Sequence, residues 1–158
     1  MPPQFITIIP ATTPEQIRIV HSLFEEYARG LNISLCFQNF SQELAELPGS
    51  YAPPKGRLLL ASVTGHAAGC VGIRSIEPGI CEMKRLYVPP NFRGRGIGQR
   101  LASAAIHEAR EAGYKVVRLD TLDSMKSAQN LYQELGFRPI APYYHNPVAG
   151  VVFLELNL

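Results

Sequence analysis

Most of the features that would tie this chain to a membrane, a nucleic acid or a metal are missing from its sequence. No apolar run in the 158 residues approaches the length of a membrane span. The formal net charge is only +2, and no stretch interleaves basic with aromatic residues, which argues against a general nucleic-acid binder. The four histidines lie far apart, without metal-ligand spacing. We therefore expect no membrane, no nucleic acid and no metal among the partners of this protein.

Disulfide and secretion patterns are also absent. The three cysteines, Cys36, Cys70 and Cys81, are odd in number and form no CxxC pair, which favours reduced, buried thiols. The start of the chain lacks the basic region and the apolar core of a signal peptide. The length suits one domain over residues 1–158. These observations predict a cytoplasmic protein with a single domain.

Hydrophobic periodicity predicts a mixed α/β (α+β) fold with the element order β-αα-βββ-α-β-α-ββ. The first helix begins at Thr13-Pro14-Glu15-Gln16, which has the pattern of a capping box. The central sheet is expected to be mixed but mostly antiparallel, with helices on both faces and one parallel crossover around a glycine-rich loop. The expected strands cover 5–9, 57–63, 67–76, 81–88, 116–121, 137–141 and 151–156, and the expected helices cover 13–30, 40–47, 99–112 and 124–135.

That loop, Arg93-Gly94-Arg95-Gly96-Ile97-Gly98, follows a strand and opens a helix. Its glycines allow close backbone approach to a ligand, and the helix start offers unpaired N–H groups and partial positive charge. This combination predicts a phosphate or pyrophosphate site. Gln99 and Arg100 replace the Lys-Ser/Thr of a nucleoside-triphosphate loop, and Gln99 replaces the third glycine of a dinucleotide fold. An ordinary strand-to-helix loop remains the structural alternative.

Three motifs in order carry a resemblance: Leu86-Tyr87-Val88-Pro89, then Arg93-x-x-Gly96-x-Gly98, then Ala128-x-x-Leu131-Tyr132-x-x-x-Gly136-Phe137. Together they resemble the GCN5-related N-acetyltransferase (GNAT) superfamily, in particular its small stand-alone bacterial members. The resemblance implies a GNAT-like fold and acetyl-CoA as the acetyl donor, held between strands 81–88 and 116–121. It implies donor contacts from Leu86, Tyr87, Val88, Arg93, Gly94, Arg95, Gly96, Ile97, Gly98 and Ser127. Met125 stands where many relatives carry a pantetheine-binding Asn, so Ser124 or Ser127 is expected to replace that contact.

The resemblance also implies the reacting groups. Glu82 is the expected base or a substrate-positioning group, and Tyr132 is the expected acid for the leaving thiolate. Period-two counting puts Glu82 on one strand face with Lys84, Leu86 and Val88, and puts Cys81 on the other face, which disfavours an acyl-cysteine route. The alternative for Glu82 is a structural ion pair with Lys84 or Arg85.

The acceptor side is less constrained. Candidate substrate residues are Glu25, Tyr27, Tyr143, Tyr144 and Asn146. The expected activity is direct acetyl transfer, in a ternary complex, to a primary amine of a small molecule. A protein or peptide N-acetyltransferase and a non-catalytic acyl-CoA sensor stay open as alternatives, and so does a homodimer.

Overall fold

The computed structural model describes residues 5–31, 35 and 39–158. Seven strands form one sheet in the order β1-β2-β3-β4-β5-β7-β6, and every neighbouring pair is antiparallel except β4 with β5. The expected fold class and element order are confirmed. The strands are β1 (Ile6–Pro10), β2 (Arg57–Val63), β3 (His66–Glu77), β4 (Ile80–Tyr87), β5 (Val116–Leu122), β6 (Arg138–Ile140) and β7 (Val151–Asn157), and the helices are α1 (Pro14–Leu31), α2 (Phe40–Glu46), α3 (Ile97–Glu111) and α4 (Lys126–Glu134).

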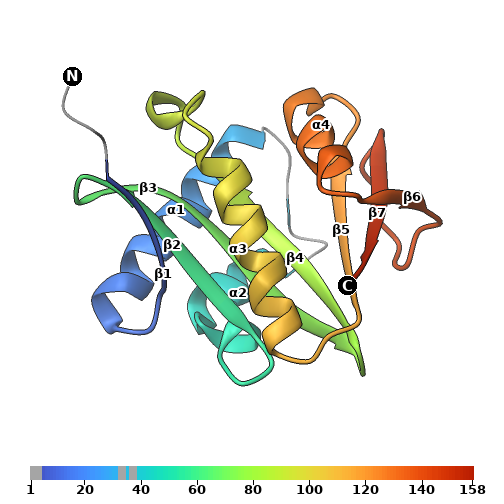
Figure 1. The fold of residues 1–158 in the computed structure, drawn as a ribbon, viewed down its shortest axis with the longest axis horizontal. Coiled ribbons are helices and arrows are strands. Elements are labelled where there is room, and N and C mark those ends of the chain that lie inside the picture. The colour runs from blue at the N-terminus through green and yellow to red at the C-terminus, as the bar shows by residue number, and fades with distance from the viewer. Residues whose placement is uncertain (1–4, 32–34, 36–38) are drawn as a thin grey trace.

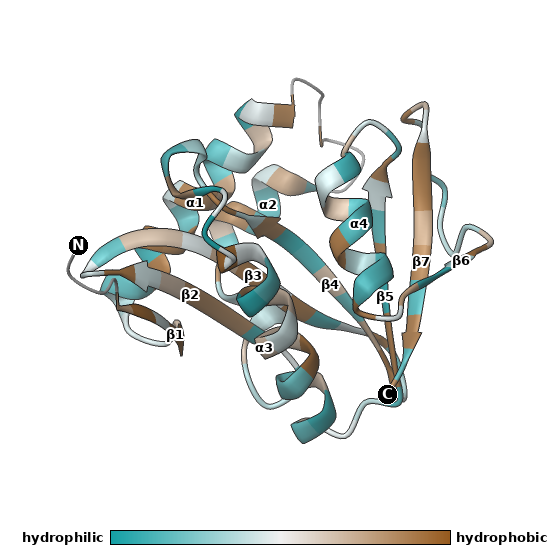
Figure 2. Cartoon of the chain, turned by 45° about the horizontal axis from the view of Figure 1, so that its top comes forward, coloured by the Kyte–Doolittle hydropathy of each residue, from teal (hydrophilic) through white to brown (hydrophobic). Residues whose placement is uncertain are grey.

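The helices lie on both faces of the sheet, as Figure 1 shows with α3 in front and α1 and α2 behind. The α3 face packs the larger core, which includes Leu101, Ala105, Leu119 and Tyr132 from α3, β5 and α4. The α1 face packs a smaller core around Phe24 and other side chains of α1 and β2. Figure 2 shows β2 as a mostly hydrophobic strand, because both of its faces are buried.

The starts of two helices show where short-range sequence patterns predict the structure correctly and where they do not. The capping box of α1 is confirmed: Gln16 N donates to Thr13 Oγ1 at 3.2 Å, and Thr13 N donates to Gln16 Oε1 at 3.0 Å. The helix expected from residue 124 begins two residues later, because Met125 occupies the cap position, without a side-chain cap bond. The turn before it is closed by the backbone, where Met125 N donates to Leu122 O at 2.9 Å.

The parallel pair β4 and β5 is joined over a short length only. Ile80, Cys81 and Glu82 pair with Val116, Val117 and Arg118, and no pairing follows beyond them. Figures 1 and 2 both show the two strands meeting at one end and diverging toward the other. The divergence leaves the β5-facing edge of β4 free of strand partners beyond Glu82, so that edge can serve a ligand.

Other expectations concern cysteines and membrane spans. Cys70 and Cys81 are buried free thiols, as expected, and Cys36 lies outside the described residues. Within the described ranges, no helix combines the length and hydropathy that a membrane span needs.

Candidate functional site

An outer groove of about 740 Å³ follows the divergence of β4 and β5. Its walls come from the end of β4, the glycine loop, the first turn of α3 and the start of α4. The donor-contact candidates that line this outer groove are Leu86, Tyr87, Val88, Arg93, Gly94, Gly96, Ile97, Gly98 and Ser127. The structure therefore gathers nine of the ten expected donor-binding residues along one continuous surface.

The glycine loop has the geometry that anion binding requires. Gly94 and Gly96 have φ angles of 81° and 77°, in the region that favours glycine, and a Cβ at either position would meet open space. Gly96 caps α3, and the first intrahelical bond runs from Arg100 N to Gly96 O. The N–H groups of the preceding turn are thus free of intrahelical partners, and no acidic residue occupies that turn.

The two loop arginines differ in position. Arg93 lines the outer groove, where its Nε donates to Val88 O at 2.8 Å and its guanidinium lies over the Tyr87 ring. Arg95 does not line the groove. It donates to Asn91 O at 3.3 Å and stacks on Phe92. Arg93 is therefore the better placed of the two cations for a pyrophosphate group.

The groove wall near Met125 differs from the family pattern. Met125, Ser124 and Ser127 all line the outer groove, and Thr121 Oγ1 donates to Met125 Sδ at 3.9 Å. Ser124 and Ser127 offer hydroxyl groups beside the methionine, and their replacement of the pantetheine-binding amide stays a prediction.

A smaller inner pocket of about 50 Å³ continues from the groove. The two share the side chains of Tyr27, Leu31, Leu86, Leu122 and Met125. The inner pocket adds the ionisable side chains of Lys84, Arg85, Asp120 and Tyr132 to an otherwise mostly apolar wall. A thioester that follows the groove would reach these groups at its inner end.

Tyr132 lies on α4 at the wall of the inner pocket and is only 7% exposed. Its ring packs edge-on against Phe137 at a centroid distance of 5.6 Å. Burial raises the pKa of Tyr132 above its usual value, and the nearby Tyr27 and Asp120 add to the effect. The phenol is therefore protonated at neutral pH, which is the state a proton donor needs.

A bulge in β4 changes the orientation of every later side chain on the strand. Arg85 has a φ of 60°, and the register shifts there: Gly72 lies opposite Lys84, but Cys70 lies opposite Tyr87. One extra residue on β4 thus moves the alternation by one position.

The expected common face of Glu82, Lys84, Leu86 and Val88 is consequently wrong. Leu86 and Val88 pack into the core beneath α3, with Met83. The charged side chains of Glu82, Lys84 and Arg85 point to the opposite face, where their ion-pair partners lie. Period-two counting failed because the bulge lies between Lys84 and Leu86.

Both carboxylate oxygens of Glu82 accept hydrogen bonds from other side chains. Arg74 donates to its Oε1 from Nε at 2.9 Å, and the Tyr143 hydroxyl donates to Oε2. Its ion pair is thus with Arg74, and the expected alternative pairing with Lys84 or Arg85 does not occur among these bonds. Glu82 is not among the residues that line the inner pocket, where the expected acid, Tyr132, lies, and its role as the base stays a prediction.

Asp120 of β5 is the carboxylate that lines the inner pocket, and the sequence did not single it out as an acceptor residue. Lys84 Nζ lies 3.4 Å from its Oδ1, and Tyr144 and Asn146 donate to its Oδ2. Burial alone would raise the pKa of Asp120, but Lys84 and these donors outweigh burial and lower it. One signal was present: Asp120 and Arg118 alternate with Val117 and Leu119, which places two charges on one face of an inner strand.

A second buried ion pair supports the pocket from α2. Arg85 donates to Glu43 through Nε at 3.1 Å and Nη2 at 3.0 Å, and the Tyr51 hydroxyl also donates to Glu43. The Arg85 side chain is 1% exposed and the Glu43 side chain 8%. The bidentate pair fixes the bulged residue of β4 against α2.

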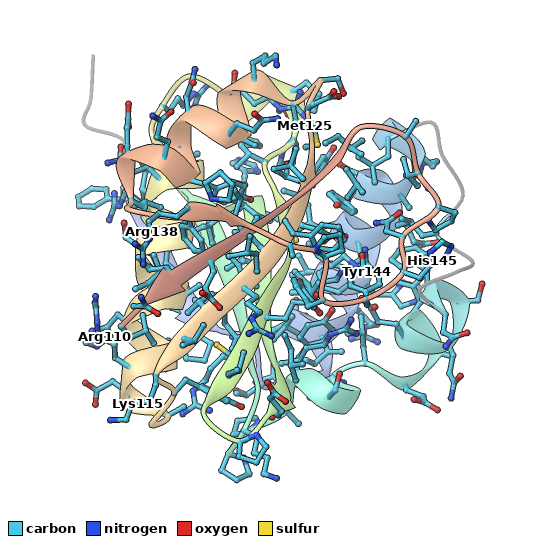
Figure 3. The ribbon with its side chains drawn as sticks, turned by 90° about the vertical axis from the view of Figure 1, so that its right-hand side faces the viewer. Arg110, Lys115, Met125, Arg138, Tyr144 and His145 are labelled. Atoms are coloured by element: carbon cyan, nitrogen blue, oxygen red, sulfur yellow. The ribbon has the colours of Figure 1, made fainter. Side chains whose placement is uncertain are left out.

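The remaining substrate candidates divide into two groups. Tyr27 and Asn146 line the inner pocket, and Tyr143 and Tyr144 bind the Glu82 and Asp120 carboxylates beside it. Glu25 is not brought to the pocket: it pairs with His21 at 3.2 Å on the solvent side of α1. Figure 3 labels Tyr144 and His145 on the loop between β6 and β7, which passes in front of α1 in that view, and Met125 at the start of α4.

Across residues 5–31, 35 and 39–158, no group of three or more His, Cys, Asp or Glu side chains could hold a metal ion.

Comparison with known proteins gives a consistent family. Residues 19–137 match the model of the acetyltransferase (GNAT) family. The chain is 39% identical over 160 residues to an uncharacterized N-acetyltransferase of Schizosaccharomyces pombe, and the match covers 100% of this chain and 98% of the relative.

Solved structures repeat the fold. A GNAT-family acetyltransferase from Staphylococcus aureus superposes with a TM-score of 0.79 at 21% identity, covering 97% of this chain and 99% of that one. A GNAT-family acetyltransferase from Elizabethkingia anophelis, with acetyl-CoA bound, superposes with a TM-score of 0.63 at 22% identity, covering 97% and 98%. At these identities the likeness concerns the fold alone.

Proposed function

Because the chain belongs to the GNAT family of acetyltransferases, we propose that it transfers the acetyl group of acetyl-CoA to the primary amine of a small molecule. The observation that carries the proposal is the continuity of the outer groove with the inner pocket that contains Tyr132. The similar Elizabethkingia anophelis enzyme holds acetyl-CoA, which supports the same donor here.

The residues of the groove suit this donor. The N–H groups at the start of α3 and the Arg93 guanidinium suit a pyrophosphate, and the unpaired edge of β4 beyond Glu82 suits the amide groups of a pantetheine arm. Acetyl-CoA supplies an activated acetyl group as a thioester. The N–H groups of that β4 edge can also donate to the oxygen that becomes negative during attack.

Direct transfer needs one bond made and one broken. The amine nitrogen attacks the thioester carbonyl carbon, the carbon–sulfur bond breaks, and the Tyr132 hydroxyl protonates the leaving sulfur. An acceptor that arrives as an ammonium ion first loses one proton to solvent. The neutral nitrogen loses a second proton after the attack, and this proton restores the Tyr132 phenolate to the phenol, so the charges balance.

An acyl-cysteine route is less well supported. Cys81 is buried in the core beneath α3 and does not line the inner pocket. Burial raises the pKa of the Cys81 thiol to about 12, so its nucleophilic thiolate is scarce at neutral pH.

The size of the inner pocket favours a small acceptor over a protein. At about 50 Å³, and with Asn146 and Val148 of the β6–β7 loop in its wall, it suits a small amine group better than a peptide segment. The test measures acetyl-CoA affinity by calorimetry and CoA release over a panel of amino acids, polyamines, aromatic amines and lysine peptides. Tight donor binding with CoA release on a small amine is expected. Release on peptides alone would contradict the small-acceptor assignment, and donor binding without release on any amine would favour a sensor.

A further inference from the structure

The loop between β6 and β7 places hydrogen-bond donors on both carboxylates near the inner pocket. The Tyr143 hydroxyl donates to Glu82, and the Tyr144 hydroxyl and the Asn146 amide donate to Asp120. The two carboxylates differ in one respect: Asp120 lines the inner pocket, and Glu82 does not. Asp120 is therefore the better placed of the two carboxylates to meet an acceptor in the pocket.

Asp120 is held in its ionised form. Lys84 lies 3.4 Å from Oδ1, and the side chains of this pair are 3% and 11% exposed. The lysine compensates part of the cost of burying the carboxylate, which keeps the pKa of Asp120 low. An ionised, largely dehydrated carboxylate is a strong acceptor for an N–H donor.

The contact from Tyr144 can be exchanged without leaving Asp120 unsatisfied. Tyr144 and Asn146 share Oδ2, and the Asn146 amide also donates to the Tyr144 oxygen at 3.0 Å. Asn146 is braced within the loop, because its Oδ1 accepts from Val148 N at 3.0 Å. If the phenol leaves, Asp120 retains Asn146 and Lys84, and both Asp120 and Asn146 line the inner pocket.

We infer that Asp120 accepts a hydrogen bond from the acceptor's amine, and that the Tyr144 hydroxyl occupies this position until the acceptor binds. The inference rests on the proposed acetyltransferase function and deepens it by naming the residue that selects the acceptor. An ammonium group is a stronger donor to a carboxylate than a neutral phenol is, whereas an alcohol is not. The bound ammonium then loses one proton to solvent, so that the neutral nitrogen can attack the thioester. Amines can displace Tyr144 and alcohols cannot, so the site selects amine acceptors.

The test compares three variants with the wild type, using CoA release on the best amine of the panel and calorimetry with acetyl-CoA. Asp120→Asn should raise the acceptor KM about ten-fold or more, the usual cost of a hydrogen bond to a charged group. Tyr144→Phe should lower the acceptor KM several-fold, because the competing donor is gone. Both variants should bind acetyl-CoA as the wild type does, since neither residue lines the outer groove.

Tyr114→Phe is the matched control, since its hydroxyl donates to Lys55 O at 2.6 Å, away from the pocket, and its acceptor KM should stay unchanged. Asp120→Asn removes the ionic partner of Lys84 and can destabilise the fold, so its thermal unfolding is recorded. Tyr144→Phe keeps this ion pair and therefore tests the inference independently. An active wild type with unchanged acceptor KM in Tyr144→Phe, or in folded Asp120→Asn, overturns the inference alone. A wild type that binds acetyl-CoA but acetylates no amine overturns the proposed function, and the inference with it.

Discussion

The outer groove and the inner pocket are built on different principles. The part of the groove that suits an anion is formed by backbone N–H groups and glycines that are neighbours in sequence, in the six-residue glycine loop and the turn that follows. The inner pocket combines apolar side chains with buried charges of β4 and β5, whose partners come from the β6–β7 loop and α2. Donor recognition is thus local, and acceptor recognition is assembled over long sequence separations. The groove should tolerate distant changes, whereas the pocket should not.

The largest expected effect is a loss of stability when one of the buried charges is removed. Arg85→Met removes one partner of a nearly inaccessible pair and leaves the Glu43 carboxylate without its bidentate donor. The free energy of unfolding should fall by about 3–5 kcal/mol, measured by urea denaturation. The double variant Glu43→Leu with Arg85→Met should recover most of this loss, because no unpaired charge remains. Equal instability of the single and double variants would contradict the role of the pair.

The next largest expected effect is a loss of turnover when the hydroxyl of Tyr132, in the inner pocket, is removed. Tyr132→Phe removes only the hydroxyl, so the packing against Phe137 is kept. Turnover should fall by about 100-fold, the lower end of general acid catalysis, with unchanged acetyl-CoA affinity. Steady-state CoA release and calorimetry separate the two quantities. A wild-type turnover number would remove the acid role from Tyr132.

A smaller effect tests the backbone character of the groove. Gly96→Asp puts a side chain and a negative charge at the helix start, so acetyl-CoA affinity should fall about thirty-fold, or about 2 kcal/mol. Gly79→Asp is the matched control: Gly79 has a similar φ of 81° and equally open surroundings, but it lies in the turn between β3 and β4. It should show a similar change in stability and no change in affinity. Equal losses of affinity at both positions would indicate backbone strain alone.

The smallest effect distinguishes the two arginines of the glycine loop. Arg93→Ala should weaken acetyl-CoA binding about ten-fold, because Arg93 lines the groove. Arg95→Ala should have a clearly smaller effect, since its side chain rests on Asn91 and Phe92. Acetyl-CoA affinity should depend more steeply on salt concentration in the wild type and in Arg95→Ala, which keep Arg93, than in Arg93→Ala. A larger loss at Arg95 would reverse the assignment.

Much of the fold followed from local patterns in the sequence. The capping box of α1 and the glycine-rich turn before α3 depend on residues within a few positions of one another, and the structure contains both. The start of α4 was placed two residues too early, because Met125 occupies the cap position without the side-chain bond on which local capping rules depend.

The candidate site shows the limit of such patterns. Period-two counting along β4 wrongly placed Leu86 and Val88 on the face of Glu82. The bulged residue Arg85 reverses the alternation of side chains, and hydrophobic periodicity does not reveal such a bulge. Glu82 kept its place on the strand, but its partners Arg74 and Tyr143 come from β3 and from the distant β6–β7 loop.

The sequence by itself determined the element order and the glycine loop at the start of α3, because helix starts, turns and an anion-binding backbone are properties of consecutive residues. Only the tertiary structure decided that Asp120, and not Glu82, faces the inner pocket beside Tyr132. The physical reason is that buried charges must find partners, and those partners, Lys84, Tyr144 and Asn146, are brought to Asp120 by sheet pairing and loop closure across the whole chain.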